Sequence, residues 1–222
     1  MFEIEKVAPR VYCAVFKRPY DLSMTFMRYQ EFYEGESAKF RGQSFSILDF
    51  IEWYCHNKNE GLTFSYHEDW GGFNIPGKII KEVVAAGIPD MNGHDHIMLA
   101  INSLIDFDLS EETKDYYLIG VSKETKETYL PHELAHGLFY TNPSFRREMT
   151  RLVGRLPKLK KEAAFAALRK IGYAENVLVD EVQAHFATGL VEELEACDAS
   201  AYLEEFEKVF KAYGVKKGIR CF

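Results

Sequence analysis

Residues 116–143 read YYLIGVSKETKETYLPHELAHGLFYTNP, which predicts a strand followed by a long helix. Tyr116–Ser122 is rich in aliphatic and aromatic residues and has charged residues on both sides, so we expect a buried strand. From Lys126 onward the apolar residues recur at helical spacing. The pair Asn142-Pro143 predicts the end of this helix, because proline disfavours helical geometry in the residue before it.

Helices dominate the rest of the chain. Arg10–Phe16 has the composition of a strand, and Thr63–Tyr66 is predicted as a further short strand. Breaks at Pro157 and Gly172 divide the C-terminal part into several helices. Helical spacing of apolar residues predicts more helices in the first half, at Leu22–Tyr33, Ile47–His56, Ile79–Ala86 and Ile97–Phe107. We therefore expect an α+β fold that is mainly helical with a small sheet.

The chain contains no internal repeat and no low-complexity linker, so we expect one domain with two sub-regions. Residues 1–90 hold 17 of the 32 aromatic residues, and we interpret this enrichment as core. Residues 91–222 form the second sub-region, which carries the chemically informative motif and the C-terminal helices.

Composition excludes several classes of protein. The 222 residues carry a net charge of −7, which argues against general nucleic-acid binding. No apolar run approaches the roughly 20 residues of a membrane span, and Met1–Arg10 lacks the apolar core of a secretory signal. The four cysteines have no metal-binding spacing, so we expect free thiols in a reducing cytoplasm: Cys13, Cys55, Cys197 and Cys221.

One segment departs from the acidic average. Residues 146–170 contain nine basic and two acidic residues, a net charge of +7. We interpret it as a solvated helical face, and a docking patch for a partner is the alternative.

The chemistry of the chain centres on His132-Glu133-Leu134-Ala135-His136. On a helix, His132 and His136 lie one turn apart on the same face, so both imidazoles can reach one metal ion. Glu133 is offset by about 100° around the helix axis, where it can miss the ion and still contact a water beside it. Three leucines would turn an apolar stripe towards the core: Leu130, Leu134 and Leu138.

Chance explains this motif poorly. A chain of this composition would contain about 0.02 such matches. The alternative is a pair of surface histidines that merely stand one turn apart. The helical context of the motif and the strand before it favour the metal-binding interpretation.

At residues 115–190 the sequence resembles the zincin metallopeptidases, through the His-Glu-x-x-His motif, the strand before it and a later helix. The metzincin branch is excluded, because it requires glycine and histidine where this chain has Phe139 and Asn142. The gluzincin branch takes its third metal ligand from a glutamate on a later helix. The resemblance thus implies a zincin-like catalytic core with bound Zn²⁺.

Glu181 is the best candidate for that third ligand. Val177–Leu190 is predicted as a helix on which Glu181 shares an apolar face with Val177, Ala184 and Val191. A carboxylate on such a face is costly to bury unless it is paired or bound to a metal. The alternative is an ion pair between Glu181 and the basic segment. The other candidate ligands are Asp180, Glu175 and Glu148.

His185 lies one turn beyond Glu181 and is expected near the same site. It would stabilise the oxyanion formed during hydrolysis, or hold Glu181 in place, or be an ordinary half-buried histidine. Tyr140 and Tyr173 are further candidate donors. Two other histidine-bearing segments, Gly93–His96 and His67–Trp70, are interpreted as polar turns, with weak chelation or substrate contact as alternatives.

These residues predict a zinc-dependent peptidase. His132, His136 and Glu181 would hold the ion, and Glu133 would act as general base. Tyr116–Ser122 is expected to pair its edge with an extended peptide or protein substrate. The alternative function is a non-catalytic or regulatory protein that binds a protein partner. Mn²⁺, Co²⁺ and Fe²⁺ also suit a site of two histidines and one carboxylate.

Overall fold

The computed structural model describes residues 2–58, 63–109, 115–189, 192–195, 197 and 199–214. These residues form an α+β fold, mainly helical with a small sheet, as expected. The chain divides into two compact units, Met1–Leu130 and Pro131–Phe222, and each is described by itself. The division falls after Leu130 and not near residue 91, where the sequence predicts it.

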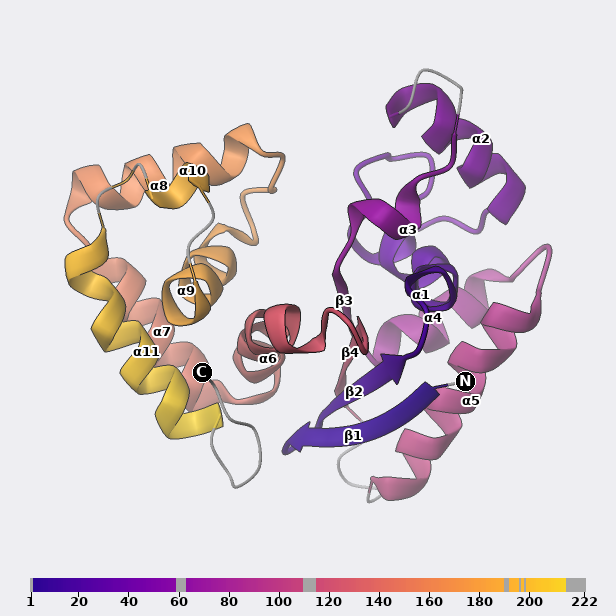
Figure 1. Cartoon of the computed structure of the whole chain (residues 1–222), viewed down its shortest axis with the longest axis horizontal. Coiled ribbons are helices and arrows are strands. Elements are labelled where there is room, and N and C mark those ends of the chain that lie inside the picture. Colours follow the sequence, from indigo (N-terminus) through magenta and orange to yellow (C-terminus); the bar gives the residue numbers. More distant parts are fainter. Residues whose placement is uncertain are drawn as a thin grey trace. The chain divides into compact units, whose positions relative to one another are not determined.

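The first unit is built on a four-stranded sheet (Figure 1). In spatial order its strands are β1 (Phe2–Ala8), β2 (Val11–Phe16), β4 (Tyr117–Ser122) and β3 (Gly72–Pro76). β2 and β4 are parallel, and the two outer strands run antiparallel to their neighbours. Every residue of β2 and β4 is buried, which explains their nearly continuous apolar sequences.

The position of β4 corrects one expectation. Tyr116–Ser122 was expected to offer a free edge to an extended peptide, but β4 is bonded to β2 on one side and to β3 on the other. An interior strand has no unpaired backbone groups to offer a peptide. β-augmentation on this strand is therefore wrong.

Five helices lie entirely within the described part of the first unit: α1 (Pro19–Glu34), α2 (Ile47–Lys58), α3 (Tyr66–Asp69), α4 (Lys78–Ala86) and α5 (Gly93–Asp108). α1 packs on β2, β4 and β3, and α4 and α5 pack against α1. The contact with the sheet is close at Gly120, where an added Cβ would clash with the ring of Phe26. Glycine in the central strand thus lets the helix approach.

Three local expectations in this unit are wrong. His67–Trp70 is not a polar turn, because His67, Glu68 and Asp69 lie in helix α3 and Trp70 follows its end. Residues 63–65 form no strand, and Tyr66 begins α3. Gly93–His96 is no turn but the first turn of α5. The helix starts early because the Asn92 side chain accepts hydrogen bonds from the amides of His94 and Asp95, while Asp95 accepts one from the Asn92 amide.

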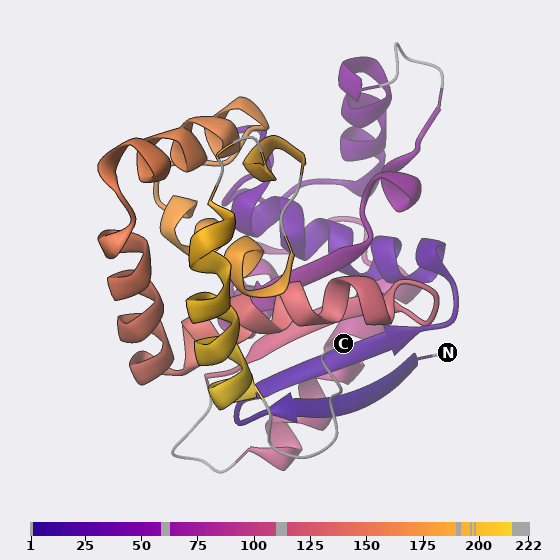
Figure 2. The same ribbon diagram turned by 60° about the vertical axis from the view of Figure 1, so that its left-hand side comes forward.

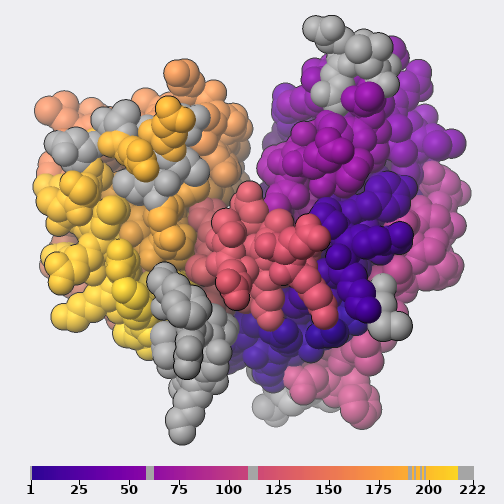
Figure 3. All heavy atoms as spheres, viewed as in Figure 1, coloured from indigo at the N-terminus to yellow at the C-terminus, as the bar shows by residue number. Residues whose placement is uncertain are grey.

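The helices that follow β4 are α6 (Lys126–Thr141), α7 (Pro143–Arg155), α8 (Lys158–Lys170), α9 (Leu178–Thr188), α10 (Glu192–Glu195) and α11 (Ser200–Gly214). α6 begins in the first unit and continues into the second. Within the second unit, α9 packs against α7, α8 and α11 (Figure 2). The ring pair Phe186–Phe206 joins α9 to α11 in the core. Figure 3 shows the yellow side chains of α11 on the surface of this unit.

No described helix has the length and apolar character needed to cross a membrane. Among the described cysteines, Cys13, Cys55 and Cys197 take part in no disulfide bond. Four residues named in the sequence analysis lie outside the described residues: Met1, Leu190, Val191 and Cys221.

Candidate metal centre

Helix α6 places the two histidines of the motif on one face. His132 and His136 are one turn apart, and their Nε2 atoms lie 3.1 Å from each other. The apolar stripe on this helix is buried as expected. The helix ends where the sequence predicted, because Asn142 accepts hydrogen bonds from the amides of Ser144 and Phe145 and so caps α7.

Helix α9 brings Glu181 to the same point. Its Oε1 lies 3.7 Å from Nε2 of His136, and its Oε2 lies 3.9 Å from Nε2 of His132. One ligand atom from each of the three residues lies within 4.8 Å of the others. The Glu181 side chain is 12% exposed. The structure thus brings together the three residues named from the sequence, near enough to hold one metal ion.

The spacing of the three side chains can be compared with the spacing of ligands around a small tetrahedral ion. Nitrogen and oxygen ligands about 2.0–2.2 Å from such an ion lie about 3.3–3.6 Å from one another. The two Nε2 atoms lie 3.1 Å apart, and each faces a different oxygen of Glu181, at 3.7 Å for His136 and 3.9 Å for His132; with one atom taken from each residue, all three lie within 4.8 Å. Two imidazoles and one carboxylate are also a donor set that zinc favours, with room for a fourth ligand.

Asp180 contacts His136 on the side of the imidazole that faces away from His132 and Glu181. Its Oδ1 lies 3.0 Å from Nδ1 of His136, and it accepts a hydrogen bond from Nε2 of Gln183 at 2.8 Å. When Nδ1 of a histidine donates to a carboxylate, Nε2 keeps the lone pair that a metal needs. From the sequence, Asp180 is only an alternative ligand, and its contact with Nδ1 of His136 is visible only in the folded structure.

The two histidines differ in their preferred charge. Burial lowers the pKa of His132 well below its ordinary value, and the neighbouring His136 and His185 lower it further. Burial also lowers the pKa of His136, but the carboxylates of Asp180 and Glu181 outweigh burial and raise that pKa well above its ordinary value. The carboxylates of Asp180 and Glu181 therefore stabilise a positive charge on or beside the His136 imidazole.

His185 lies beside the three candidate ligands. Its Nε2 is 3.9 Å from Oε2 of Glu181, and its ring centroid is 4.5 Å from that of His132. The side chain is buried rather than half-buried, and Nδ1 lies 3.4 Å from the carbonyl oxygen of Gly189. The structure thus places His185 at the site, and its role as oxyanion donor or support of Glu181 stays a prediction.

Glu133 follows His132 directly on α6 and is buried. Its carboxylate is one of the groups that raise the pKa of His136, so its charge acts within the site. Its role as general base stays a prediction.

The alternative ligands are engaged elsewhere. Glu148 accepts a hydrogen bond from the Tyr213 hydroxyl at 2.6 Å, and Glu175 is paired with Arg169. Both bonds occupy carboxylates that the sequence alone left open as ligands. The suggested roles of Tyr140 and Tyr173 stay predictions.

Since two helices would have to supply the ligands of one ion, the sequence also predicts that residues 130–141 and 176–195 pack side by side, and the structure corrects this prediction. The second helix is shorter, since α9 spans Leu178–Thr188 and ends at Gly189 with a φ of 142°. The helices packed most closely on α9 are α11, α7 and α8. α6 instead meets α9 through the imidazole and carboxylate side chains of the site. Ala184 is fully buried.

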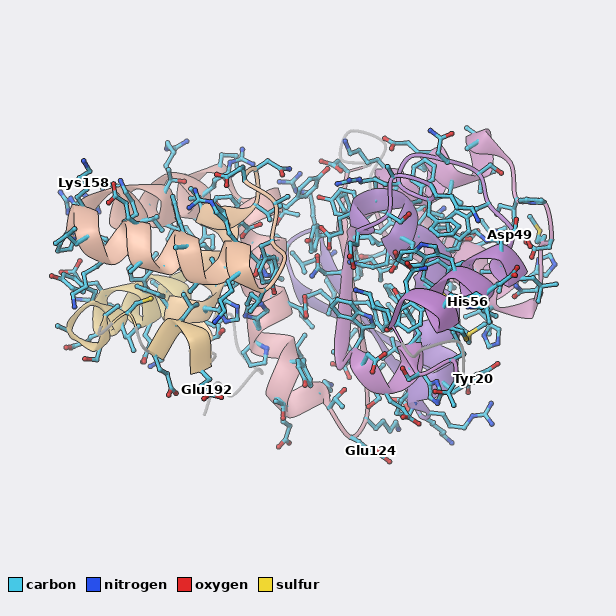
Figure 4. All side chains as sticks on the ribbon, turned by 90° about the horizontal axis from the view of Figure 1, so that it is seen from above. Tyr20, Asp49, His56, Glu124, Lys158 and Glu192 are labelled. Atoms are coloured by element: carbon cyan, nitrogen blue, oxygen red, sulfur yellow. The ribbon has the colours of Figure 1, made fainter. Side chains whose placement is uncertain are left out.

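The basic segment lies mainly at the surface. Arg147, Arg151 and Arg155 are exposed at one-turn intervals along α7. Lys158 extends outward from the start of α8 (Figure 4), with 84% of its side chain exposed. Glu181, for which an ion pair with this segment was the alternative, lies 3.7–3.9 Å from the histidines at 132, 136 and 185.

In comparisons with family models, curated proteins and solved structures, none matches this chain. The functional interpretation therefore rests on the geometry and chemistry of the site itself.

Proposed function

We propose that this protein is a zinc-dependent hydrolase, and specifically a metallopeptidase. One observation carries the proposal: His132, His136 and Glu181 converge within 4.8 Å, directly beside Glu133 in the chain. Two imidazoles and one carboxylate satisfy three positions of a tetrahedral ion and leave one position open. An open position beside a carboxylate is the arrangement of a catalytic site rather than a structural one.

Each side chain has a defined task in this mechanism. A zinc ion at this site would supply Lewis acidity, polarising the substrate carbonyl and acidifying water. Glu133 takes a proton from water as the water oxygen attacks the carbonyl carbon. His185 donates a hydrogen bond to the oxygen that becomes negative. Glu133 then passes its proton to the amide nitrogen, the C–N bond breaks, and a carboxylic acid and an amine leave.

Asp180 acts through His136 and is a positioning residue. It holds Nδ1 and so keeps Nε2 directed at Glu181 and His132. We also propose a cytoplasmic location, because buried thiols outside any disulfide, such as Cys13 and Cys197, suit a reducing compartment.

The alternative function is a non-catalytic protein that binds a partner through its basic surface. The exposed arginines at 147, 151 and 155 on α7 favour it. It differs from the peptidase in one respect that can be measured, because it requires no general base.

Substitution of Glu133 by glutamine tests the proposal. Glutamine keeps the shape of the side chain but cannot take a proton. The zinc-loaded wild type and Glu133→Gln would be incubated with a diverse peptide mixture, and new chain ends identified by mass spectrometry. The variant should retain zinc and lose hydrolysis by about 10²–10⁴-fold.

The matched control is Glu127→Gln, at the exposed start of the same helix, which should cleave like wild type. Equal cleavage by Glu133→Gln and wild type would contradict the mechanism. A zinc-loaded wild type that cleaves no peptide would favour the partner-binding alternative.

A further inference from the structure

The first unit contains a second feature with the character of a binding site. A hollow of about 450 Å³ lies where the start of α1, helix α3, the start of β3 and the first turn of α6 come together. The side chains that give it its chemistry are Arg18, Tyr20, Glu68, Asp69, Trp70 and Tyr129. None of them belongs to the candidate metal centre.

Aromatic side chains are concentrated in this hollow. Among the described residues, four large aromatic side chains are exposed, and three of them line it: Tyr20 (46%), Trp70 (51%) and Tyr129 (40%). The fourth, Phe107, lies outside it. Exposed aromatic groups cost free energy in water, so a cluster of three on one concave surface indicates a ligand.

The aromatic walls are held in place. The ring of Tyr129 packs so closely on Gly71 that an added Cβ there would clash with it. The Thr125 hydroxyl donates to the Gly71 carbonyl oxygen at 2.8 Å, which ties the start of α6 to β3. On the other side, Tyr20 (labelled in Figure 4) packs edge-on against His67, with the ring centroids 5.5 Å apart.

The charge that the hollow offers to a ligand is negative. Arg18 is the strongest cation there, but Asp21 takes hydrogen bonds from its Nε at 2.8 Å and its Nη2 at 2.6 Å. This pairing neutralises Arg18 locally and occupies the first turn of α1, where an anion would otherwise bind. Glu68, whose Oε1 lies 3.6 Å from Nε2 of His67, and Asp69 are the acidic groups that line the hollow.

Asp69 is prepared for such a ligand. The hydroxyl groups of Tyr54 and Ser65 both donate to its Oδ2, which fixes the orientation of the carboxylate. A ligand would then bind through Oδ1. A fixed carboxylate beside three aromatic faces matches a cation with a flat, weakly hydrated surface.

We propose that this hollow binds a cationic group, and that the best match is the guanidinium of an arginine side chain on a peptide. The planar cation stacks on Trp70 and its neighbouring rings while it donates hydrogen bonds to Asp69 and Glu68. The inference goes beyond the proposed hydrolysis and does not depend on it, because every residue involved lies in the first unit.

Nuclear magnetic resonance of the full chain tests this directly. The chain has two tryptophans, so the indole N–H signals of Trp53 and Trp70 are assigned by comparison with Trp70→Phe. N-acetyl-L-arginine amide is the probe, and N-acetyl-L-citrulline amide is its neutral analogue of the same shape. Only the arginine probe should shift the Trp70 signal to saturation, and added salt should weaken its binding.

Glu68→Gln with Asp69→Asn should weaken the arginine probe by about three- to tenfold, because the charge is lost while the new amide oxygen still accepts from Tyr54. Asp49→Asn, an exposed acid on α2 (Figure 4), is the matched control and should bind like wild type. His132→Ala should also bind like wild type. Equal binding of the citrulline probe, unchanged affinity in the double variant, or no saturable shift would each overturn the proposal.

Discussion

Nδ1 of His136 lies 3.0 Å from Oδ1 of Asp180, the residue directly before Glu181 in helix α9. One turn of α9 thus supplies two carboxylates with different tasks. Glu181 faces the Nε2 atoms of both histidines, and Asp180 holds the other nitrogen of one of them. Such outer partners orient a ligand and increase its basicity.

Asp180→Asn should therefore weaken zinc binding without removing any ligand. We expect the affinity to fall by about 10–100-fold, the usual effect of losing such a partner. Competition with a coloured zinc chelator measures it. Glu175→Gln, five residues earlier and paired with Arg169, is the control that should bind zinc like wild type. Unchanged affinity in Asp180→Asn would show that His136 needs no support.

His185→Ala separates the two roles suggested for that residue. As an oxyanion donor, His185 would affect the reaction rather than the ion, so we expect zinc to be retained and kcat to fall by about 10²–10³-fold. Zinc content and steady-state kinetics would be measured on the same preparation. Loss of zinc comparable to that of Glu181→Ala would instead assign His185 to the support of Glu181.

A buried carboxyl group makes the stability of the first unit depend on pH. Glu31 on α1 is buried and accepts a hydrogen bond from the Tyr66 hydroxyl at 2.8 Å. Burial raises its pKa from 4.5 to about 7, since desolvation outweighs the hydrogen bond that lowers it. The folded state therefore binds this proton more tightly than the unfolded chain does.

The sign of the effect follows from that difference. The protonated Glu31 contributes fully to the free energy of unfolding below pH 4.5. As the pH rises to about 7 this contribution is lost, which lowers the free energy of unfolding by on the order of 3 kcal/mol. Glu31→Gln should remove this pH dependence of the free energy of unfolding, because glutamine stays neutral and still accepts a hydrogen bond from Tyr66. Urea unfolding at several pH values measures it, with exposed Glu34→Gln as control. A slope that stays the same in Glu31→Gln would contradict the buried-proton account.

Most helices, and the three residues of the candidate metal site, could be predicted from the sequence. Apolar residues at helical spacing gave the interiors of α1, α2, α4 and α5, and proline and glycine gave the breaks between the later helices. The spacing of His132 and His136, and the apolar surroundings of Glu181, were sufficient to name three residues that the structure brings together.

The outer strands β1 and β3 could not be predicted from local sequence patterns. β1 carries Glu3, Glu5 and Lys6, because an edge strand keeps contact with solvent and its alternation is weak. β3 begins with Gly72 and ends with Pro76, which reads as a turn, and it forms because it pairs with β4. Pairing between strands distant in the sequence leaves no local pattern.

The same reason explains the division of the chain. β4 belongs to the first unit because it pairs with β2 and β3, although it lies beyond residue 91. The role of Asp180 was also hidden, since only the folded structure shows which of two adjacent carboxylates faces which nitrogen of His136.

The central claim is that His132, His136 and Glu181 hold one metal ion, and elemental analysis of the purified protein tests it most directly. After expression with zinc in the medium, wild type should contain about one equivalent of zinc, and Glu181→Ala should lose most of it because one direct bond is gone. Glu148→Gln and Glu175→Gln, whose carboxylates are engaged elsewhere, should keep the wild-type content. Full zinc in Glu181→Ala, or no zinc in wild type, would contradict the account.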